Sequence, residues 1–268
     1  MLNHLHFNNW SEYVKFCETR KLASKVEHSR SNSNTFCGGV TFDEALNLAK
    51  TGWPEGTARI KTLSQVLTDK VYSCVEKPEI QYDVTGADWD IGALMQGVPE
   101  CWYRYDNTLE KAPGKVLHVV FNGTASGGVE PEVIEAKGAA ISAFIECLEL
   151  TGNKVSVDIV FHAGPTGPKR DNYQLMTIEL KQAGQPLDLD RLSFALAHPA
   201  SLRRLTFAAY ESFPYGSDSG YGQPKEYSTG ADVYIGCSMH GQPKWIDTEA
   251  ATEWIFKQLK DQGVSIID

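Results

Sequence analysis

The segment from Lys115 to Gly164 constrains the fold more than any other part of the chain. It opens with a nearly unbroken apolar run of strand length, Lys115–Phe121, and continues with a glycine-rich turn, Asn122–Gly128. A helix is predicted from Pro131 to about Leu150, because its apolar residues recur at i, i+3, i+4 and i+7 and share one face. A second predicted strand, Lys154–Phe161, completes the unit. Strand, helix and strand at this spacing predict a βαβ crossover, which requires a parallel sheet and almost always a right-handed connection.

The remainder of the chain divides into an N-terminal segment and a core domain. Residues 1–77 predict a helical segment, in which Thr41–Glu44 forms a capping box that starts one helix. Residues 78–268 predict an α/β core domain, with strands at Glu79–Val84 and Val98–Tyr105 ahead of the βαβ unit. We therefore expect an α/β fold in which a mostly parallel sheet is flanked by helices on both faces.

Composition argues against several classes of protein. A hydrophobic fraction of 42% in 268 residues is enough for a sizeable core, so a globular protein is expected. No run of about 18 apolar residues exists to predict a membrane-spanning helix, and the first residues lack the pattern of a signal peptide. The six cysteines are scattered without a C-x-x-C pair, which favours reduced thiols in a cytosolic protein. The net charge of −9 argues against broad, non-specific nucleic-acid binding but is compatible with a local basic groove.

The sequence lacks the motifs of common enzyme classes, since neither G-x-S-x-G nor H-E-x-x-H occurs. Asp88 and Asp90 would point in different directions on a helix, so we interpret them as helix caps rather than as an acid–base pair. His118 and His162 could lie side by side if their strands pair, but two histidines alone make no metal site. We therefore predict no enzyme activity, no cofactor and no metal, and keep a hydrolase with an unrecognised site as a third alternative.

Binding to single-stranded nucleic acid fits the remaining features. It requires cations that follow the phosphates and exposed aromatic rings on which bases stack. The candidate nucleic-acid-binding residues lie in three stretches: Trp102 and Arg104 on one face of a predicted strand; Lys169, Arg170 and Tyr173 at a loop–strand junction; and Arg203 and Arg204 with the loop residues Tyr215, Tyr221, Lys225 and Tyr227. Each stretch also fits an ordinary explanation, respectively an aromatic strand, a solvated turn and a surface loop.

The turn after the first strand of the βαβ unit carries Asn122, Thr124 and Ser126. With its flanking strand and helix it resembles a von Willebrand factor A-type domain, in which a D-x-S-x-S motif at this place binds a metal. Here a neutral Asn122 replaces the aspartate, and hard divalent cations prefer carboxylate oxygens, so the loop is expected to be metal-free. The resemblance covers about residues 115–240 and implies an alternative function, a non-catalytic protein-interaction module with a degenerate metal site.

Five stretches carry a second resemblance: Phe42–Ala49, Gly52–Gly56, Val84–Gly86, Gly97–Cys101 and Lys137–Ala140. Through them the chain is similar, over about two-thirds of its length, to an uncharacterised protein family carried by bacteriophages and plasmids. A more specific similarity, which no single motif carries, is to the single-stranded-DNA-binding RNA polymerase cofactors of short-tailed phages. It implies a protein of the host cytoplasm that binds single-stranded DNA and assists a phage RNA polymerase in transcription. Self-association of the protein is compatible with this role.

Overall fold

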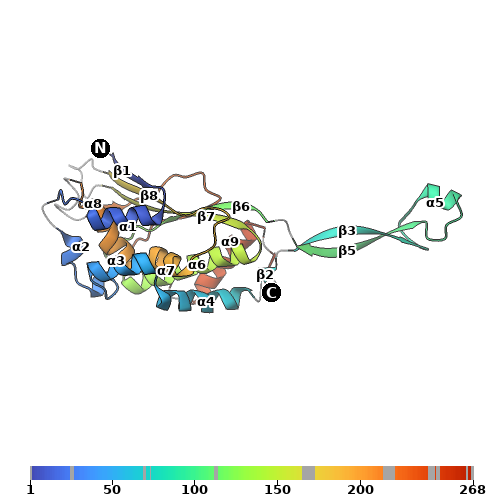
Figure 1. Ribbon diagram of the computed structural model, residues 1–268. Coiled ribbons are helices and arrows are strands. Elements are labelled where there is room, and N and C mark those ends of the chain that lie inside the picture. The colour runs from blue at the N-terminus through green and yellow to red at the C-terminus, as the bar shows by residue number, and fades with distance from the viewer. Residues whose placement is uncertain are drawn as a thin grey trace.

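The computed structural model describes residues 2–24, 27–68, 71–72, 74–111, 114–164, 173–213, 221–240, 245, 248–263 and 265–266. They form a body, built from a six-stranded sheet, a short two-stranded sheet and the helices, and a long β-hairpin arm that extends away from the body (Figure 1). Among the described residues, no helix is long and apolar enough to cross a lipid bilayer.

The central sheet has six strands in the order β1-β8-β7-β6-β10, with β9 paired to β7. The strands are β1 (Leu2–Phe7), β6 (Val116–Asn122), β7 (Lys154–Gly164), β8 (Tyr173–Lys181), β9 (Gln223–Pro224) and β10 (Val233–Ile235). The pairs β1–β8, β6–β7 and β6–β10 are parallel, whereas β7 pairs antiparallel with β8 and β9. The predicted α/β class with a mostly parallel sheet is confirmed.

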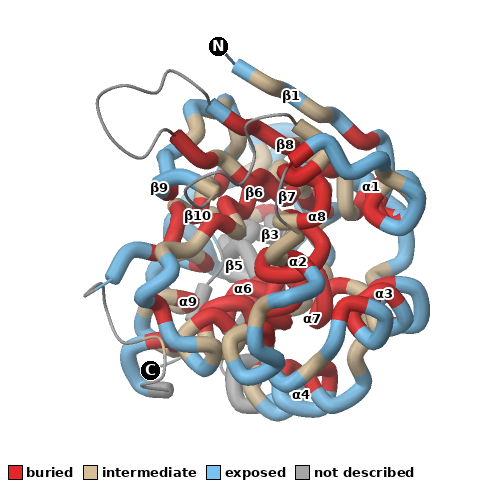
Figure 2. Tube along the Cα trace, turned by 90° about the vertical axis from the view of Figure 1, so that its left-hand side faces the viewer, coloured by how far each residue is buried: buried red, intermediate tan, exposed pale blue. Residues whose placement is uncertain are grey.

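Helix α6 (Pro131–Leu150) connects β6 to β7 as the predicted βαβ unit. Proline suits its first turn because that N–H would have no helical partner. Gly138 marks a close approach to the neighbouring helix, since a Cβ there would lie 2.2 Å from the Cα of Ala197. In Figure 2, α6 is red along almost its whole length, whereas β1 at the sheet edge is mostly pale blue and tan. The helix is therefore the buried centre of the body.

The other helices of the body are α1 (Trp10–Thr19), α2 (His28–Ser31), η1 (Thr35–Cys37), α3 (Phe42–Thr51), α4 (Pro54–Thr68), α7 (Leu189–Ala197), η2 (Ser201–Thr206), α8 (Phe207–Tyr210) and α9 (Thr248–Asp261). The short strands β2 (Val71–Tyr72) and β11 (Ser265–Ile266) pair with each other. The predicted capping box at α3 is confirmed, because Thr41 accepts from the Glu44 N–H while the Glu44 carboxylate accepts from the Thr41 N–H.

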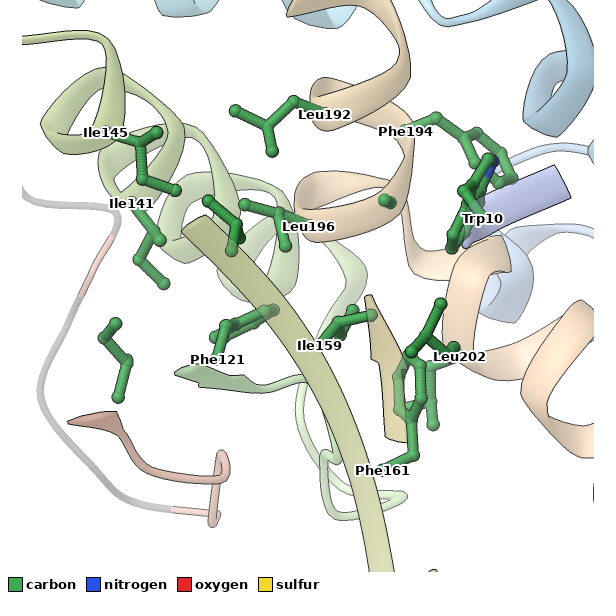
Figure 3. Packing of buried hydrophobic residues seen from close by; sticks show 14 of the residues in the cluster. Trp10, Phe121, Ile141, Ile145, Ile159, Phe161, Leu192, Phe194, Leu196 and Leu202 are labelled. Atoms are coloured by element: carbon green, nitrogen blue, oxygen red, sulfur yellow. The ribbon is translucent and has the colours of Figure 1, made fainter. Parts of the chain in front are cut away.

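One hydrophobic core joins the N-terminal helices to the sheet (Figure 3). Trp10 of α1 packs against Phe194 of α7, and both belong to the same buried cluster as Phe121 and Ile159 of the central strands. The sequence predicted residues 1–77 as a helical segment preceding the α/β domain. In the structure its helices share the core of that domain, and Leu2–Phe7 forms the edge strand β1, so the boundary at residue 77 does not separate two cores.

Helices flank the central sheet, as predicted, and those of the described residues pack over the face that carries the larger hydrophobic core (Figure 1). The physical reason lies in the alternation of the strands. The residues that point away from the core are partly polar, such as His4 and His6 beside Thr177. A smaller apolar cluster on that face, around Val120 and Val160, is covered by side chains of the chain between β9 and β10 rather than by a helix.

The arm consists of β3 (Cys74–Asp83) and β5 (Trp102–Lys111), paired antiparallel from Cys74 opposite Lys111 to Asp83 opposite Trp102. Its far end carries the two-residue strand β4 (Asp88–Trp89), paired with β5, and the short helix α5 (Ile91–Met95) (Figure 1). The predicted strands near residues 79–84 and 98–105 therefore exist, but they form a separate three-stranded sheet instead of joining the core.

Candidate nucleic-acid interface

The carboxyl ends of β6, β7 and β10 meet at one edge of the sheet, where β9 closes against the end of β7. In open α/β sheets, ligands bind in the crevice outside the carboxyl ends of the strands. The turn into β9 requires glycine, because Gly222 has φ +98° and a Cβ there would lie 2.2 Å from the carbonyl oxygen of Gly164. This turn places the chain after residue 221 beside the last residues of β7.

Four side chains gather at this edge: His162, Tyr173, Lys225 and Tyr227, here called the aromatic platform. The ring centroid of His162 lies 6.2 Å from that of Tyr173 and 6.5 Å from that of Tyr227. A Cβ at Gly164 would lie 2.7 Å from Cε of Lys225 and 3.2 Å from Cε1 of Tyr173, so both side chains flank this glycine. Three of the predicted residues, from two separate stretches, are thus brought together around a histidine.

Backbone contacts hold the platform in place. His162 Nδ1 lies 2.9 Å from the carbonyl oxygen of Glu226, which can only accept, so Nδ1 carries the hydrogen. The backbone N–H of Lys225 donates to the carbonyl of His162 at 3.0 Å. The Lys225 and Tyr173 side chains are exposed, and within the described ranges no carboxylate forms an ion pair with Lys225. A cation and an aromatic ring are therefore presented to solvent side by side.

The loop that resembles a degenerate metal motif supports the platform. Asn122 is fully buried, and its Nδ2 donates to the Lys225 carbonyl at 2.9 Å, while its Oδ1 accepts from the Thr124 N–H. The Thr124 hydroxyl accepts from the His162 N–H at 2.8 Å. No group of three His, Cys, Asp or Glu side chains suited to a metal occurs in the described part of the chain. Asn122 and Thr124 therefore connect β6 to the platform through hydrogen bonds.

The predicted surface position of Arg203 and Arg204 is wrong, since both are buried with 1% exposure. Arg203 donates to the carbonyls of Phe36 and Val129. Arg204 donates to the carbonyls of Val40 and Ser29 and to Oδ1 of Asn34. Backbone carbonyls from distant parts of the chain replace the water that these guanidinium groups would need, which is why they can lie inside.

The remaining predicted residues lie elsewhere. Tyr221 is half-buried: its ring stacks on Phe207 with centroids 3.8 Å apart, and its hydroxyl donates to Glu211. Trp102 and Arg104 lie on the arm, away from the platform (Figure 1), where Trp102 contacts the ring of Trp89 at 5.0 Å. The predicted contacts at Lys169, Arg170 and Tyr215 fall outside the described residues.

Comparison with known proteins identifies the family of this chain. Residues 2–265 match the model of a family described as a domain of unknown function (DUF7192). The chain belongs to the DUF7192 family. No curated protein matches the chain, and no solved structure matches it. The match covers the arm as well as the body, so both are parts of the DUF7192 domain.

Burial governs the reactivity of the polar groups in this DUF7192 domain. Burial raises the pKa of the Cys17 thiol to about 12 and that of the Cys237 thiol to about 11, which disfavours the nucleophilic thiolate. Burial also lowers the pKa of Lys137 to about 8. The Lys137 amine donates to the Gly236 carbonyl at 2.6 Å and to the Ser238 hydroxyl at 3.0 Å, and so connects α6 to the end of β10.

The histidine and aspartate pairs considered from the sequence do not form shared sites. The strand register places His118 opposite Ser156, and its Nε2 lies 2.9 Å from the Asp158 carboxylate rather than beside His162. Asp90 caps α5, because its Oδ1 accepts from the N–H groups of Gly92 and Ala93, as the sequence predicted. These backbone hydrogen bonds, chiefly that from Ala93, lower the pKa of Asp90.

Sequence reasoning missed two features of the DUF7192 domain. The first is His162 as the centre of the platform, since the sequence indicated only a possible pairing of His162 with His118. The second is the apolar arm tip, although Ile91, Leu94 and Met95 recur at helical spacing without a partner segment nearby in the sequence. That unpaired apolar face was the one signal that could have indicated an exposed tip.

Proposed function

We propose that the protein is a non-catalytic single-stranded-DNA-binding protein, in the role that its phage resemblance implies, assisting a phage RNA polymerase in transcription. The observation that carries the proposal is the convergence of Tyr173, Lys225 and Tyr227 around His162. Rings and a cation at one edge match the two requirements of single-strand binding, stacking surfaces for bases and charge for phosphates. Asn122 and Thr124 hold this edge rigidly, which lowers the entropic cost of binding.

Replacing both platform tyrosines by alanine is the direct test. In a fluorescence-anisotropy titration with a labelled single strand, the Tyr173→Ala, Tyr227→Ala variant is expected to bind more weakly than the unmodified protein. Loss of stacking costs about 1–3 kcal/mol per base, which corresponds to roughly 5- to 150-fold in affinity per ring. The Tyr173→Phe variant keeps the ring and is expected to bind as the unmodified protein does.

Two lysine variants separate the electrostatic contribution. Lys225→Ala is expected to reduce the slope of log affinity against log salt by about 0.7, the value for one phosphate of a single strand. Lys61→Ala is the matched control, because Lys61 is also exposed but lies on α4, on another part of the body. Absence of binding at low salt, or equal affinity for the double-alanine variant, would refute the proposal.

A second candidate function, a protein-interaction module, is favoured by the arm tip. Seven large apolar side chains are exposed there: Tyr82, Val84, Trp89, Ile91, Leu94, Met95 and Val98. Met95 is 84% exposed, the highest value among the exposed apolar residues of the described chain. Exposed apolar side chains gathered at the end of a projecting arm indicate an interaction site. Asp83, Asp88, Asp90 and Glu100 surround it with only Arg104 as a cation, so the tip suits a basic protein surface better than a nucleic acid.

The occupant that we propose for the tip is a second copy of the chain. A groove of about 420 Å³ on the body has a floor of Trp10, Val14 and Ala49. Its walls carry Lys15, Lys50 and Arg191 against one carboxylate, Glu18, so the groove has a net positive charge that complements the acidic tip. Figure 1 shows the arm pointing away from the body, so the tip reaches the groove of another copy rather than its own. Cooperative assembly along a strand is common among single-strand-binding proteins.

Sedimentation velocity tests this contact. The unmodified protein is expected to associate as its concentration rises, and the Ile91→Asp, Met95→Asp variant to lower the association constant by about 100-fold or more, since each buried side chain contributes about 1.5–3 kcal/mol. Leu150→Asp, at an exposed apolar residue on the body, is the control and should leave association unchanged. A monomer at all concentrations, or an assembly insensitive to the tip variant, would exclude the second copy and leave another protein, such as the polymerase, as the occupant.

A further inference from the structure

A cavity of about 330 Å³ lies on the helix side of the same sheet edge. Thr124, Ala125 and Gly127 of the loop after β6 and Ala163 of β7 form one wall. Ala163 and His162 are consecutive in a strand and therefore point to opposite faces, so the cavity and the aromatic platform lie on opposite sides of the end of β7. The volume is at the lower end of the range for small-molecule sites.

The opposite walls of the cavity are aromatic. Phe36, Phe207, Tyr210 and Tyr221 line it, and the rings of Phe207 and Tyr221 stack with an interplanar angle of 19°. Tyr210 also carries a buried hydroxyl for which the described residues provide no hydrogen-bond partner. Buried polar groups are normally satisfied, so an unpaired hydroxyl beside a cavity indicates a missing acceptor or donor. Such walls suit a flat aromatic group with polar edges.

A buried cation lines the same cavity without a counter-ion. The Arg203 guanidinium lies 3.8 Å from the ring centroid of Phe36 and donates to two backbone carbonyls, which leaves N–H groups unused. Glu130 and Glu132 lie near enough to raise its pKa, but within the described residues neither forms an ion pair with it. Burial lowers the pKa of Arg203 to about 10, so it stays charged at neutral pH. Buried charges are normally paired with an opposite charge, whereas among the described residues Arg203 has carbonyl partners but no carboxylate in an ion pair.

Two neighbouring arginines each differ from Arg203, one in its ionic partner and the other in its position. Arg20 pairs with the buried Glu211 at 3.0 Å. Arg204 has the same burial as Arg203 and follows it in η2, but it donates four hydrogen bonds and does not line the cavity. Only Arg203 of these three combines a cavity position with the lack of an anionic partner. The missing partner is therefore expected to be the anionic part of a ligand.

We propose that this cavity binds a single nucleotide, with the base against the walls formed by Phe36, Phe207 and Tyr221 and the phosphate at Arg203. The inference goes beyond strand binding at the platform and does not depend on it. The nucleotide is either a free mononucleotide or the phosphorylated end of a strand, because both present the same base and phosphate. A bidentate contact between guanidinium and phosphate supplies much of the recognition.

Isothermal titration calorimetry of the full chain with dTMP and dAMP is the test. A 5′-mononucleotide is expected to bind at least tenfold more tightly than thymidine or inorganic phosphate alone. Arg203→Lys keeps the positive charge but removes the planar guanidinium that makes a bidentate contact, and it is expected to weaken nucleotide binding about tenfold. Phe207→Leu removes one wall and should weaken binding about fivefold, and it keeps the proposal testable if the Arg203 variant does not fold.

The matched control is Arg204→Lys, which changes the same residue type with the same burial in the same helix and should leave nucleotide affinity unchanged. Competition of dTMP with 5′-phosphorylated and unphosphorylated oligonucleotides distinguishes the two sources, since only a strand-end site favours the phosphorylated strand. The Tyr173→Ala, Tyr227→Ala variant should lose strand binding but keep mononucleotide binding, which separates this site from the platform. The inference would be overturned if neither nucleotide bound at millimolar concentration. It would also be overturned if the Arg203→Lys and Phe207→Leu variants both bound nucleotides as tightly as the unmodified protein does.

Discussion

Replacing Glu211 by alanine is expected to destabilise the protein by about 3–5 kcal/mol, the cost of removing one partner of a buried ion pair. Glu211 is fully buried and accepts four hydrogen bonds. Two come from the backbone and hydroxyl of Ser29, one from Arg20 at 3.0 Å and one from the Tyr221 hydroxyl at 2.5 Å. Without the carboxylate, the Ser29 N–H and the hydroxyls of Ser29 and Tyr221 lose this acceptor, and Arg20 keeps only Glu27 as an ionic partner.

Urea unfolding of the Glu211→Ala variant measures this loss directly. Glu18→Ala is the control, because Glu18 forms an exposed ion pair with Lys50, and removing such a pair costs only about 0–1 kcal/mol. Similar midpoints for the two variants would show that Glu211 does not hold α2 and α8 together. Since Tyr221 lines the cavity, the Glu211 variant is also expected to bind nucleotides more weakly, provided that it remains folded.

Acidification from pH 7 to pH 4 is expected to remove about 3 kcal/mol of stability through His198 alone. Burial lowers the pKa of His198 to about 4, from an ordinary value near 6.5. The unfolded chain therefore binds a proton below about pH 6.5, whereas the folded chain resists protonation until about pH 4. The contribution of His198 to the free energy of unfolding is fully present above pH 6.5. It falls as the pH drops from 6.5 to 4, because the unfolded state binds more protons than the folded state.

The environment of His198 explains why its neutral form is favoured. The ring centroid of His198 lies 4.7 Å from that of Trp53 and 5.2 Å from that of Phe194. Its Nδ1 accepts a hydrogen bond from the Ala200 N–H at 3.1 Å. The His198→Asn variant retains an acceptor but does not titrate. Its unfolding free energy should therefore fall by about 3 kcal/mol less than that of the unmodified protein between pH 7 and pH 4. His4→Asn, at an exposed strand position, should follow the unmodified protein, and equal pH dependence of the unmodified protein and the His198 variant would contradict the prediction.

Local patterns predicted those parts of the fold that depend on neighbouring residues. The βαβ unit follows from the switch between a continuous apolar run and helical spacing, and the capping box at Thr41–Glu44 from two side chains three positions apart. The same reasoning found both strands of the arm. It failed on their placement, because nothing in the spacing of residues 74–111 distinguishes a strand of the core from a strand of a projecting hairpin.

The two adjacent arginines illustrate where sequence reasoning about the site fails. A pair of arginines is usually exposed, since a buried charge requires partners. Here all six residues of η2 are buried, and the partners of Arg203 and Arg204 are carbonyls of residues between Ser29 and Val40 and of Val129. These groups are more than 70 positions away in the chain. Their position depends on how α2 and η1 pack against η2, and no local pattern encodes that packing.

The amino-acid sequence by itself determined the α/β class, the parallel βαβ unit and the chemistry of three platform residues, because periodicity and residue type act over a few positions. The tertiary structure alone decided that β9 closes on β7 and so unites Tyr173 with Lys225 and Tyr227. It also decided which arginines lie inside and that the arm projects from the body. These outcomes depend on pairings between segments far apart in the chain, whose energies arise only when the whole core packs together.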